Sequence, residues 1–484
     1  MMKIKSLIKD SSVYGIGNFV CKAVSFLVFP LYTYVLTVED FGVMELVNTG
    51  VGIVSILINL GLSNAVQRYY YDNNIENKDK SIIISSGFFC MAVFGLGILL
   101  LSIICIYYIY NKILYYEYSI QLILVLIALI NVYIFQHMYY CMDVMRLHFK
   151  SWQFTLISCM SSLLTVGFTI LFLFYLNAGV LGCFLASTIA NVLTIIFAIY
   201  FIRCDLTLNF DFIWCKKLLI YGLPIMCAGL FYIALSAVDR WLLMLYANVE
   251  QIGLYSIGFK FANIIIFINN AMFQAFMPFC MKMYLEDSKY KNKISQIYSY
   301  YICLLSFLAA IISLFSKEIL MVLVSEDFWE SYNILSVLVI GMVMYATTQY
   351  ASIGITFEKK TKYMTYVSFM TLLLNIFLNY IFIPTYYAIG AAMAMCISYL
   401  AMTILYFYIT YRIHYIPFSM KINLYCLFTM VCSMLLGIFI EQTPGDMYIL
   451  FIKIFMLLFL FSPIVYALYR DYKASFSNLW AGNR

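Results

Sequence analysis

The sequence that decides the fold is a short polar segment that occurs twice between apolar stretches. Residues 37–42 read Thr-Val-Glu-Asp-Phe-Gly, and residues 248–253, 211 positions later, read Asn-Val-Glu-Gln-Ile-Gly. Two weaker echoes have nearly the same offset: residues 150–152 with 360–363, and residues 182–186 with 390–394. Chance explains one such match, but three at nearly one offset predict a chain built from two related halves.

The composition around these segments is that of a membrane protein. Hydrophobic residues make up 65% of the 484 residues and charged residues only 11%, against about 25% charged residues in an average soluble domain. The mean hydropathy is +0.93. A soluble fold of this size needs a polar surface that this chain cannot supply, which excludes a soluble enzyme, a DNA-binding protein and a disordered scaffold.

The number of transmembrane helices is predicted from the hydrophobic runs in the sequence. A helix needs about 20 apolar residues to cross a bilayer. The sequence contains fourteen such runs, near residues 13–36, 42–62, 82–109, 118–141, 152–176, 179–202, 218–245, 252–278, 298–315, 334–356, 364–383, 388–411, 424–440 and 447–469. It therefore predicts an all-α integral membrane protein with 14 transmembrane helices.

The repeat divides these spans into two six-helix lobes. Residues 1–217 hold spans 1–6 as an N-lobe, residues 218–420 hold spans 7–12 as a C-lobe, and residues 421–484 hold spans 13 and 14 and a tail. Because six is an even number, both lobes have the same orientation in the membrane. A parallel repeat of this kind is expected to surround a central cavity.

Lysine and arginine in the loops predict the orientation. Alternate loops and the two termini hold 23 of the 29 basic residues, whereas the other side holds only Lys112 and Lys317. Cytoplasmic loops of membrane proteins are enriched in these residues. Both termini, and the segment 203–217, are therefore expected in the cytoplasm.

Charges inside the spans are the candidate site, because a charge at mid-bilayer costs at least about 2.5–3.5 kcal/mol. Lys22 in span 1 and Lys260 in span 8 lie too deep to reach an interface comfortably, and we expect them to line the cavity. Asp239 and Arg240 lie nearer the outer end of span 7, and Glu45 is shallow in span 2. The interior is net positive, which favours an anionic ligand such as a diphosphate or carboxylate.

Other charges admit a simpler interpretation. Arg68 closes span 2, Asp143 and Arg146 close span 4, and Lys453 lies about six residues inside span 14. The long basic side chains at these positions are expected to reach an interface. Asp239 and Arg240 are expected either to line the cavity or to pair with another helix.

No metal or cofactor is expected. The three histidines, His137, His148 and His414, are far apart in sequence, and no Cys-x-x-Cys pair occurs. Most of the 14 cysteines lie in apolar runs, where cysteine packs as a small hydrophobic residue.

The order of several short motifs resembles a known family. These motifs are residues 29–33 (Phe-Pro-Leu-Tyr-Thr), 36–42, 61–62 with 68–70, 221–224 (Tyr-Gly-Leu-Pro), 238–240 (Val-Asp-Arg), 253–256 (Gly-Leu-Tyr-Ser), 373–375 with 383–384, and 389–392 (Ile-Gly-Ala-Ala). Over about residues 5–412 the chain resembles the polysaccharide-transporter branch, of Wzx-like O-unit or capsule-unit flippases, in the multidrug/oligosaccharidyl-lipid/polysaccharide flippase superfamily.

The resemblance implies a function. It implies a flippase that moves undecaprenyl-diphosphate-linked oligosaccharide from the cytoplasmic to the outer leaflet of the bacterial cytoplasmic (inner) membrane, for O-antigen, capsule or exopolysaccharide synthesis. Its partners would be the lipid-linked oligosaccharide and the bilayer, with a repeat-unit polymerase and a chain-length regulator as further candidates and no nucleic acid. The candidate residues are substrate-binding cations Lys22, Lys260, Arg240 and Arg68, and coupling or structural carboxylates Asp239, Glu45 and Asp143.

Two alternatives stay open. A drug/cation antiporter of the same superfamily would need deep carboxylates to bind its cation, whereas the deep charge here is mainly basic. An enzyme that polymerises lipid-linked repeats normally needs a sizeable outer loop, and the longest expected here is only about residues 316–333. We therefore expect a transporter rather than an enzyme.

Overall fold

The computed structural model describes residues 30–70, 77–109, 121–148, 150–207, 210–358, 360, 362–440, 448–449 and 451–463. These residues form helices and short connections, with no β-strand among them. Eleven helices of this described part are long and apolar enough to cross a membrane. The predicted all-α membrane fold is thereby confirmed. The chain divides into two compact units, Met1–Trp241 and Leu242–Arg484, which we call the N-unit and the C-unit.

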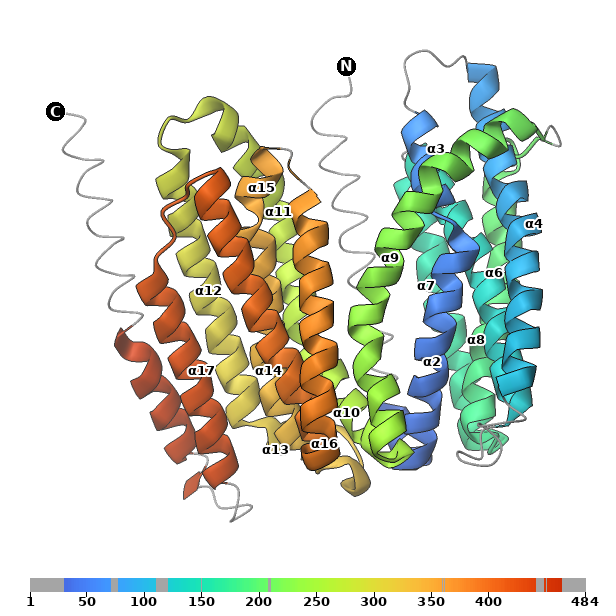
Figure 1. Cartoon of the computed structure of the whole chain (residues 1–484). Coiled ribbons are helices and arrows are strands. Elements are labelled where there is room, and N and C mark those ends of the chain that lie inside the picture. The colour runs from blue at the N-terminus through green and yellow to red at the C-terminus, as the bar shows by residue number, and fades with distance from the viewer. Residues whose placement is uncertain are drawn as a thin grey trace. The chain divides into compact units, whose positions relative to one another are not determined.

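The N-unit is built around α6. Its helices are α2 (Val38–Asn59), α3 (Leu62–Tyr70), α4 (Asn77–Ile109), α6 (Leu122–Leu147), α7 (Ser151–Ile170) with the π-helical turn η2 (Leu171–Tyr175), α8 (Gly179–Ile202), and α9 (Phe212–Tyr246), whose end passes into the C-unit. α6 packs against α8, α2 and α4, and α7 packs against α8 (Figure 1). Methionine, tyrosine and aliphatic side chains of α6 supply much of the core between them.

The C-unit is built around α14 (Ser331–Ala351), which contacts α16, α10 and α12 (Figure 1). Its other helices are α10 (Val249–Ala262), α11 (Ile264–Glu286), α12 (Tyr290–Leu314), α13 (Ser316–Leu323), η3 (Glu326–Phe328), α15 (Ile353–Phe357), α16 (Lys362–Ile413) and α17 (Met420–Ile440), followed by an apolar helix at Phe451–Pro463. Most of α14 is buried on all sides, as expected of a helix that is apolar all round.

The 52-residue helix α16 contains two of the predicted spans. Its backbone leaves the helical region at Tyr387 (φ 49°, ψ −127°), three residues after Pro384. Proline lacks the N–H group that would continue the helical bonding pattern, so the break falls between spans 11 and 12 as the sequence predicts. Spans 2–13 each have a helical counterpart, but span 1 lies almost wholly outside the described residues, and the total of fourteen stays a prediction.

The repeated hexapeptide is a helix-capping motif. Thr37 Oγ1 accepts a hydrogen bond from Asp40 N (3.1 Å), and the Asp40 carboxylate accepts one from Thr37 N (3.2 Å), which caps α2. At α10, Asn248 Oδ1 accepts from Gln251 N at 3.0 Å. The Gln251 carboxamide accepts instead from Ala388 N at 3.3 Å, just after the break in α16. The same cap thus begins an equivalent helix in each unit.

Equivalent contacts inside the two units support the internal repeat. Asn59 Nδ2 donates to Gln136 Oε1 (3.1 Å) in the N-unit, and Gln349 Nε2 donates to Asn270 Oδ1 (3.4 Å) in the C-unit, at offsets of 211 and 213 residues. Buried thiol contacts have the same offsets: Cys90 with Cys215 at 2.7 Å, and Cys303 with Cys426 at 3.9 Å. The division into residues 1–217, 218–420 and 421–484 describes this repeat rather than the compact units, and it stays a prediction.

Candidate functional site

The second span is broken where it reaches the polar side chains of α6. α2 ends at Leu60 in the left-handed conformation (φ 52°), Gly61 follows at φ 68°, and α3 begins at Leu62. Irregular backbone at membrane depth is tolerated where it is buried in protein or lines a cavity. The break is therefore expected either to be buried in protein or to line a cavity in this part of the N-unit.

Two glycines bring α9 against this break. A Cβ atom on Gly61 would lie 2.2 Å from the carbonyl oxygen of Gly222, and one on Gly222 would lie 2.4 Å from the carbonyl oxygen of Leu60. Both distances are shorter than any real Cβ contact. Only glycine permits this approach, and at Gly61 only glycine adopts the backbone conformation without strain.

Two adjoining cavities of about 320 and 290 Å³ lie beside the break. Both are lined by Asn59, Asn64 and Tyr139, so we treat them as one site and call it the N-unit recess. α2, α3 and α6 line the first cavity, and α9 adds Met226 and Gly229 to the second. Each volume is near the lower end of the range for small-molecule sites, about 300–1,000 Å³.

Carboxamide side chains dominate the polar lining of the recess. Asn59 donates to Gln136, and the Gln136 Nε2 group donates in turn to Ser55 Oγ. Asn64 and Gln67 also line the first cavity, and neither side chain has a hydrogen-bond partner among the residues that the structure describes. The recess therefore offers amide donors and acceptors that a ligand can use.

The charges in the lining compensate each other. Arg146 NH1 lies 3.2 Å from Asp143 Oδ1, one helical turn away on α6. The Arg146 guanidinium also lies over the Phe154 ring at 4.7 Å and over the Tyr139 ring at 5.8 Å. Asp143 is thus one member of an ion pair, and the described lining of the recess carries one positive and one negative charge.

The equivalent polar cluster of the C-unit includes an additional hydroxyl group. Asn269 is fully buried, donates to Gln349 Oε1 at 3.1 Å, and accepts a hydrogen bond from the Tyr301 hydroxyl. Tyr350 covers Tyr301, with ring centroids 3.9 Å apart. In the N-unit the position 213 residues before Tyr301 is Phe88, which has no hydroxyl group. The amide cluster of the C-unit therefore has a tyrosine hydroxyl partner that the cluster of the N-unit lacks.

The buried charges predicted from the sequence form a pair between helices. Arg240 on α9 lies 3.8 Å from Glu45 on α2, and both side chains are at least nine-tenths buried. Asp239, beside Arg240, is fully buried. The sequence left open whether Asp239 and Arg240 line a cavity or pair with another helix, and for Arg240 the structure provides the pairing.

The remaining predicted cations have different settings. Lys260 is half-buried in the last turn of α10, and Arg68 is exposed in the last turn of α3. Lys22 lies outside the described residues. Lys453 was expected to reach the interface, and this expectation is wrong: its side chain is 1% exposed and lies 2.6 Å from Glu318 Oε1. The Glu318 carboxylate, rather than water at the interface, compensates the charge of the Lys453 ammonium group.

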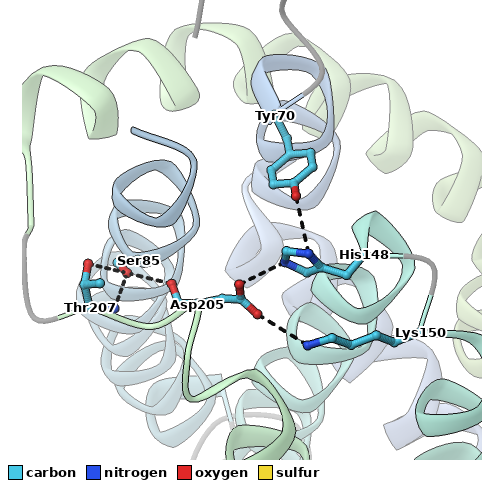
Figure 2. A network of polar contacts seen from close by, with 6 residues as sticks. All are labelled: Tyr70, Ser85, His148, Lys150, Asp205 and Thr207. Carbon is cyan, nitrogen blue, oxygen red and sulfur yellow. Dashed lines mark hydrogen bonds and ion pairs between the residues drawn. The ribbon is translucent and has the colours of Figure 1, made fainter. Parts of the chain in front are cut away.

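A second polar network fixes the connection between α8 and α9 (Figure 2). His148 Nε2 and Lys150 Nζ lie 3.1 and 3.7 Å from the two carboxylate oxygens of Asp205, and the Tyr70 hydroxyl lies 3.4 Å from His148 Nδ1. Burial raises the pKa of Asp205, but His148 and Lys150 lower it further, so the pKa lies below the ordinary 3.8. Next to it, Ser85 Oγ accepts from the backbone N–H of Thr207 at 2.8 Å.

The C-unit contains the same cluster with its charges exchanged. His414 Nδ1 lies 2.9 Å from Glu358 Oε1, and His414 Nε2 lies 2.8 Å from the Tyr290 hydroxyl. Glu358 follows His148 by 210 residues, and His414 follows Asp205 by 209. Each unit therefore joins the ends of two equivalent helices through a histidine and a carboxylate. No group of three or more potential metal ligands occurs in the described part of the chain.

Known families match this chain over most of its length. The model of the family described as "Polysaccharide biosynthesis protein" matches residues 7–284, which is more than half of the sequence and includes every residue of the recess. The chain belongs to the polysaccharide biosynthesis protein family. A second family model, MatE, matches residues 224–381. The superfamily predicted from the sequence is confirmed, while its Wzx-like branch stays a prediction.

Individual relatives agree with this assignment. An "Uncharacterized membrane protein" of Haemophilus influenzae is 27% identical over 292 residues, covering 58% of this chain and 67% of the relative. The solved structure of "Lipid II flippase MurJ, inward closed conformation" has a TM-score of 0.69 and 16% identity, covering 95% of this chain and 99% of that one. An inward-facing multidrug resistance MATE transporter has a TM-score of 0.66 and 15% identity, covering 83% and 94%. At such identities the two structures establish a common fold.

Sequence reasoning missed the recess. Asn59 and Gln136 are 77 residues apart, and neither belongs to a recognisable motif. The available signal was the repeat itself, since an Asn and a Gln recur at positions 270 and 349.

Proposed function

We propose that this protein is a flippase for undecaprenyl-diphosphate-linked oligosaccharide repeat units. It would move them from the cytoplasmic to the outer leaflet of the bacterial cytoplasmic membrane for surface polysaccharide synthesis, with both termini cytoplasmic. The observation that carries the proposal is the match to the polysaccharide biosynthesis protein family over residues 7–284. A multi-pass helical fold with a polar recess in the matched region supports it.

Transport would occur by alternating access of the two lobes, with the polyprenyl tail left in lipid. We assign the diphosphate to Lys22, Lys260, Arg240 and Arg68, since arginine and lysine form charge-assisted hydrogen bonds with phosphate oxygens. Because Glu45 pairs with Arg240, an arriving diphosphate would compete with that carboxylate for the guanidinium. Glu45, with Asp239 and Asp143, would then have a coupling or structural role. An inside-negative potential favours outward movement of each negative charge by about 2.3 kcal/mol per 100 mV.

The test is a flipping assay in vesicles. The purified chain is reconstituted with fluorescent undecaprenyl-diphosphate-linked sugar, and the lipid that reaches the opposite leaflet is measured. The Lys22→Gln, Lys260→Gln double variant should lose most activity, because each lost charge-assisted contact costs on the order of 1.5–3 kcal/mol. Lys421→Gln, an exposed lysine at the start of α17, is the control. Wild-type flipping by the double variant would contradict the assignment of the lysines, and absence of flipping by the wild-type chain would contradict the function.

A drug/cation antiporter is the second candidate, because the MatE family model matches residues 224–381. Such a protein would expel cationic dyes from vesicles in exchange for protons or sodium. Glu45 is paired with Arg240 at 3.8 Å, which disfavours it as a cation site. Dye efflux that depends on Glu45, without lipid flipping, would favour this candidate. A third candidate, a repeat-unit polymerase, would lengthen the lipid-linked chains instead of moving them.

A further inference from the structure

We propose that the N-unit recess binds the first sugar of the head group, and that the sugar it takes is uncharged and carries hydroxyl or acetamido groups. This inference rests on the proposed function and assigns one part of the substrate to one place in the fold. The diphosphate is left to the basic residues discussed above.

The charge of the recess disfavours a diphosphate. Among the described residues, the charged side chains of its lining are Asp143 and Arg146, and they form an ion pair with each other at 3.2 Å. A ligand with at least two negative charges would gain little from this pair, because attraction by the guanidinium is offset by repulsion from the carboxylate. An uncharged ligand does not depend on a net positive charge.

The hydrogen-bonding groups of the recess suit a sugar. A sugar hydroxyl donates and accepts, and a carboxamide side chain also offers both functions. Asn64 and Gln67 are exposed and line the cavity without a side-chain partner among the described residues, so a ligand can engage them without displacing another described side chain. Ser63 and Asn59 lie on the same wall and add a hydroxyl and a further amide.

Tyr139 supplies an apolar surface beside these polar groups. Its ring lines both cavities and is 37% exposed. Small-molecule sites commonly combine an aromatic wall with a few polar groups that fix orientation. The apolar face of a pyranose ring can pack on Tyr139 while the hydroxyl groups at its edge reach Asn64 and Gln67.

One part of the recess wall, around Asn59 and Gln136, is held in place before any ligand arrives. Gln136 bonds to both Asn59 and Ser55, and the contact of Gly61 with Gly222 fixes the break in span 2. Preorganised side chains lose little conformational entropy on binding. In the C-unit the Tyr301 hydroxyl donates to Asn269, whereas the equivalent Phe88 of the N-unit has no hydroxyl group, so the two units differ in this respect.

The experiment compares two probes that differ only in the sugar. Binding of undecaprenyl diphosphate and of undecaprenyl-diphosphate-N-acetylglucosamine to the full chain in lipid nanodiscs is measured by native mass spectrometry. The wild-type chain should bind the glycosylated lipid more tightly. The Asn64→Leu, Gln67→Leu double variant should lose about tenfold or more for the glycosylated lipid and bind the bare lipid as wild type does. Asn292→Leu, an exposed carboxamide on α12, is the matched control.

A second pair of variants tests the aromatic wall and guards against misfolding. Tyr139→Phe should keep the preference for the glycosylated lipid, and Tyr139→Leu should reduce it, while both chains unfold at the wild-type temperature. If the carboxamide and Tyr139→Leu variants weaken both lipids equally, the recess holds the diphosphate and the inference is wrong. If they bind both lipids as wild type does, the inference is also wrong although the proposed function stands. A wild-type chain that binds neither lipid contradicts the proposed function as well.

Discussion

Replacing Gly61 with alanine tests whether the break in span 2 is as tightly packed as its geometry indicates. The new methyl group would lie 2.2 Å from the carbonyl oxygen of Gly222, and its backbone would stay at φ 68°. The left-handed conformation costs an L-residue roughly 1–2 kcal/mol. Overpacking against a backbone atom costs about 1–3 kcal/mol more. We therefore expect Gly61→Ala to destabilise the folded chain by roughly 2–5 kcal/mol.

Matched variants separate the close contact from the loss of glycine itself. Gly222→Ala meets the Leu60 carbonyl oxygen at 2.4 Å without positive φ, so it should cost only the overpacking part, about 1–3 kcal/mol. A methyl group on Gly97 of α4 would have no heavy atom of another part of the chain within 4 Å. Gly97→Ala should therefore stabilise its helix by about 0.5–1 kcal/mol.

The assay is thermal unfolding of the purified chain in detergent, and the rank order of the midpoints is the readout. Gly97→Ala should unfold at or above the wild-type temperature, Gly222→Ala below it, and Gly61→Ala at the lowest temperature. A Gly61→Ala chain that unfolds with the wild type would refute the close approach of α9 to the break.

Three further predictions concern charged residues. Arg240→Gln removes the guanidinium that lies 3.8 Å from the buried Glu45 carboxylate and should cost about 3–5 kcal/mol. The double variant Glu45→Gln, Arg240→Gln should be less destabilised than Arg240→Gln in the same thermal assay, and simple additivity would argue against the pair. The pKa of Asp205 is lowered below 3.8, so its carboxylate stabilises the fold above that pH and this contribution disappears as pH falls through the lowered pKa. Asp205→Asn should therefore lower the unfolding midpoint at pH 7 but much less at pH 3, and an equal deficit at both values would contradict this. Lys453→Met removes the 2.6 Å contact with Glu318 and should lower the midpoint temperature of thermal unfolding. The double variant Lys453→Glu, Glu318→Lys, which exchanges the two charges, should recover part of the loss. An unchanged midpoint in Lys453→Met would show that the pair adds no stability.

The sequence predicts the helices well because the bilayer constrains them strongly. A spanning segment must be apolar and must satisfy its own backbone groups, so length and hydropathy locate it. The structure shows further local detail that hydropathy does not give: the Thr37 and Asn248 segments cap helices, and Pro384 lies just before the break between two spans.

The polar contacts were harder to foresee because their members are distant in sequence. Lys453 contacts Glu318, which lies 135 residues earlier in the sequence. A hydropathy pattern contains no information on which helices contact each other. The recess has the same origin, since it arises where a helix break, an amide pair and a neighbouring glycine come together. The candidate cations follow from depth in the spans and from the family resemblance, neither of which identifies the residues that they contact, and their roles stay predictions.

In the two units a histidine and a carboxylate have exchanged places while the contact between them has survived. In two halves that arose by duplication, exchanging the histidine and the carboxylate takes a substitution at each position. The sequence with only one of these substitutions lacks the contact or makes it with other side chains. Selection then acts on the contact and not on either residue. Among related chains, substitutions at 148 and 205 should therefore be correlated, as should those at 358 and 414. A measure of conservation taken one position at a time would not detect such a correlation.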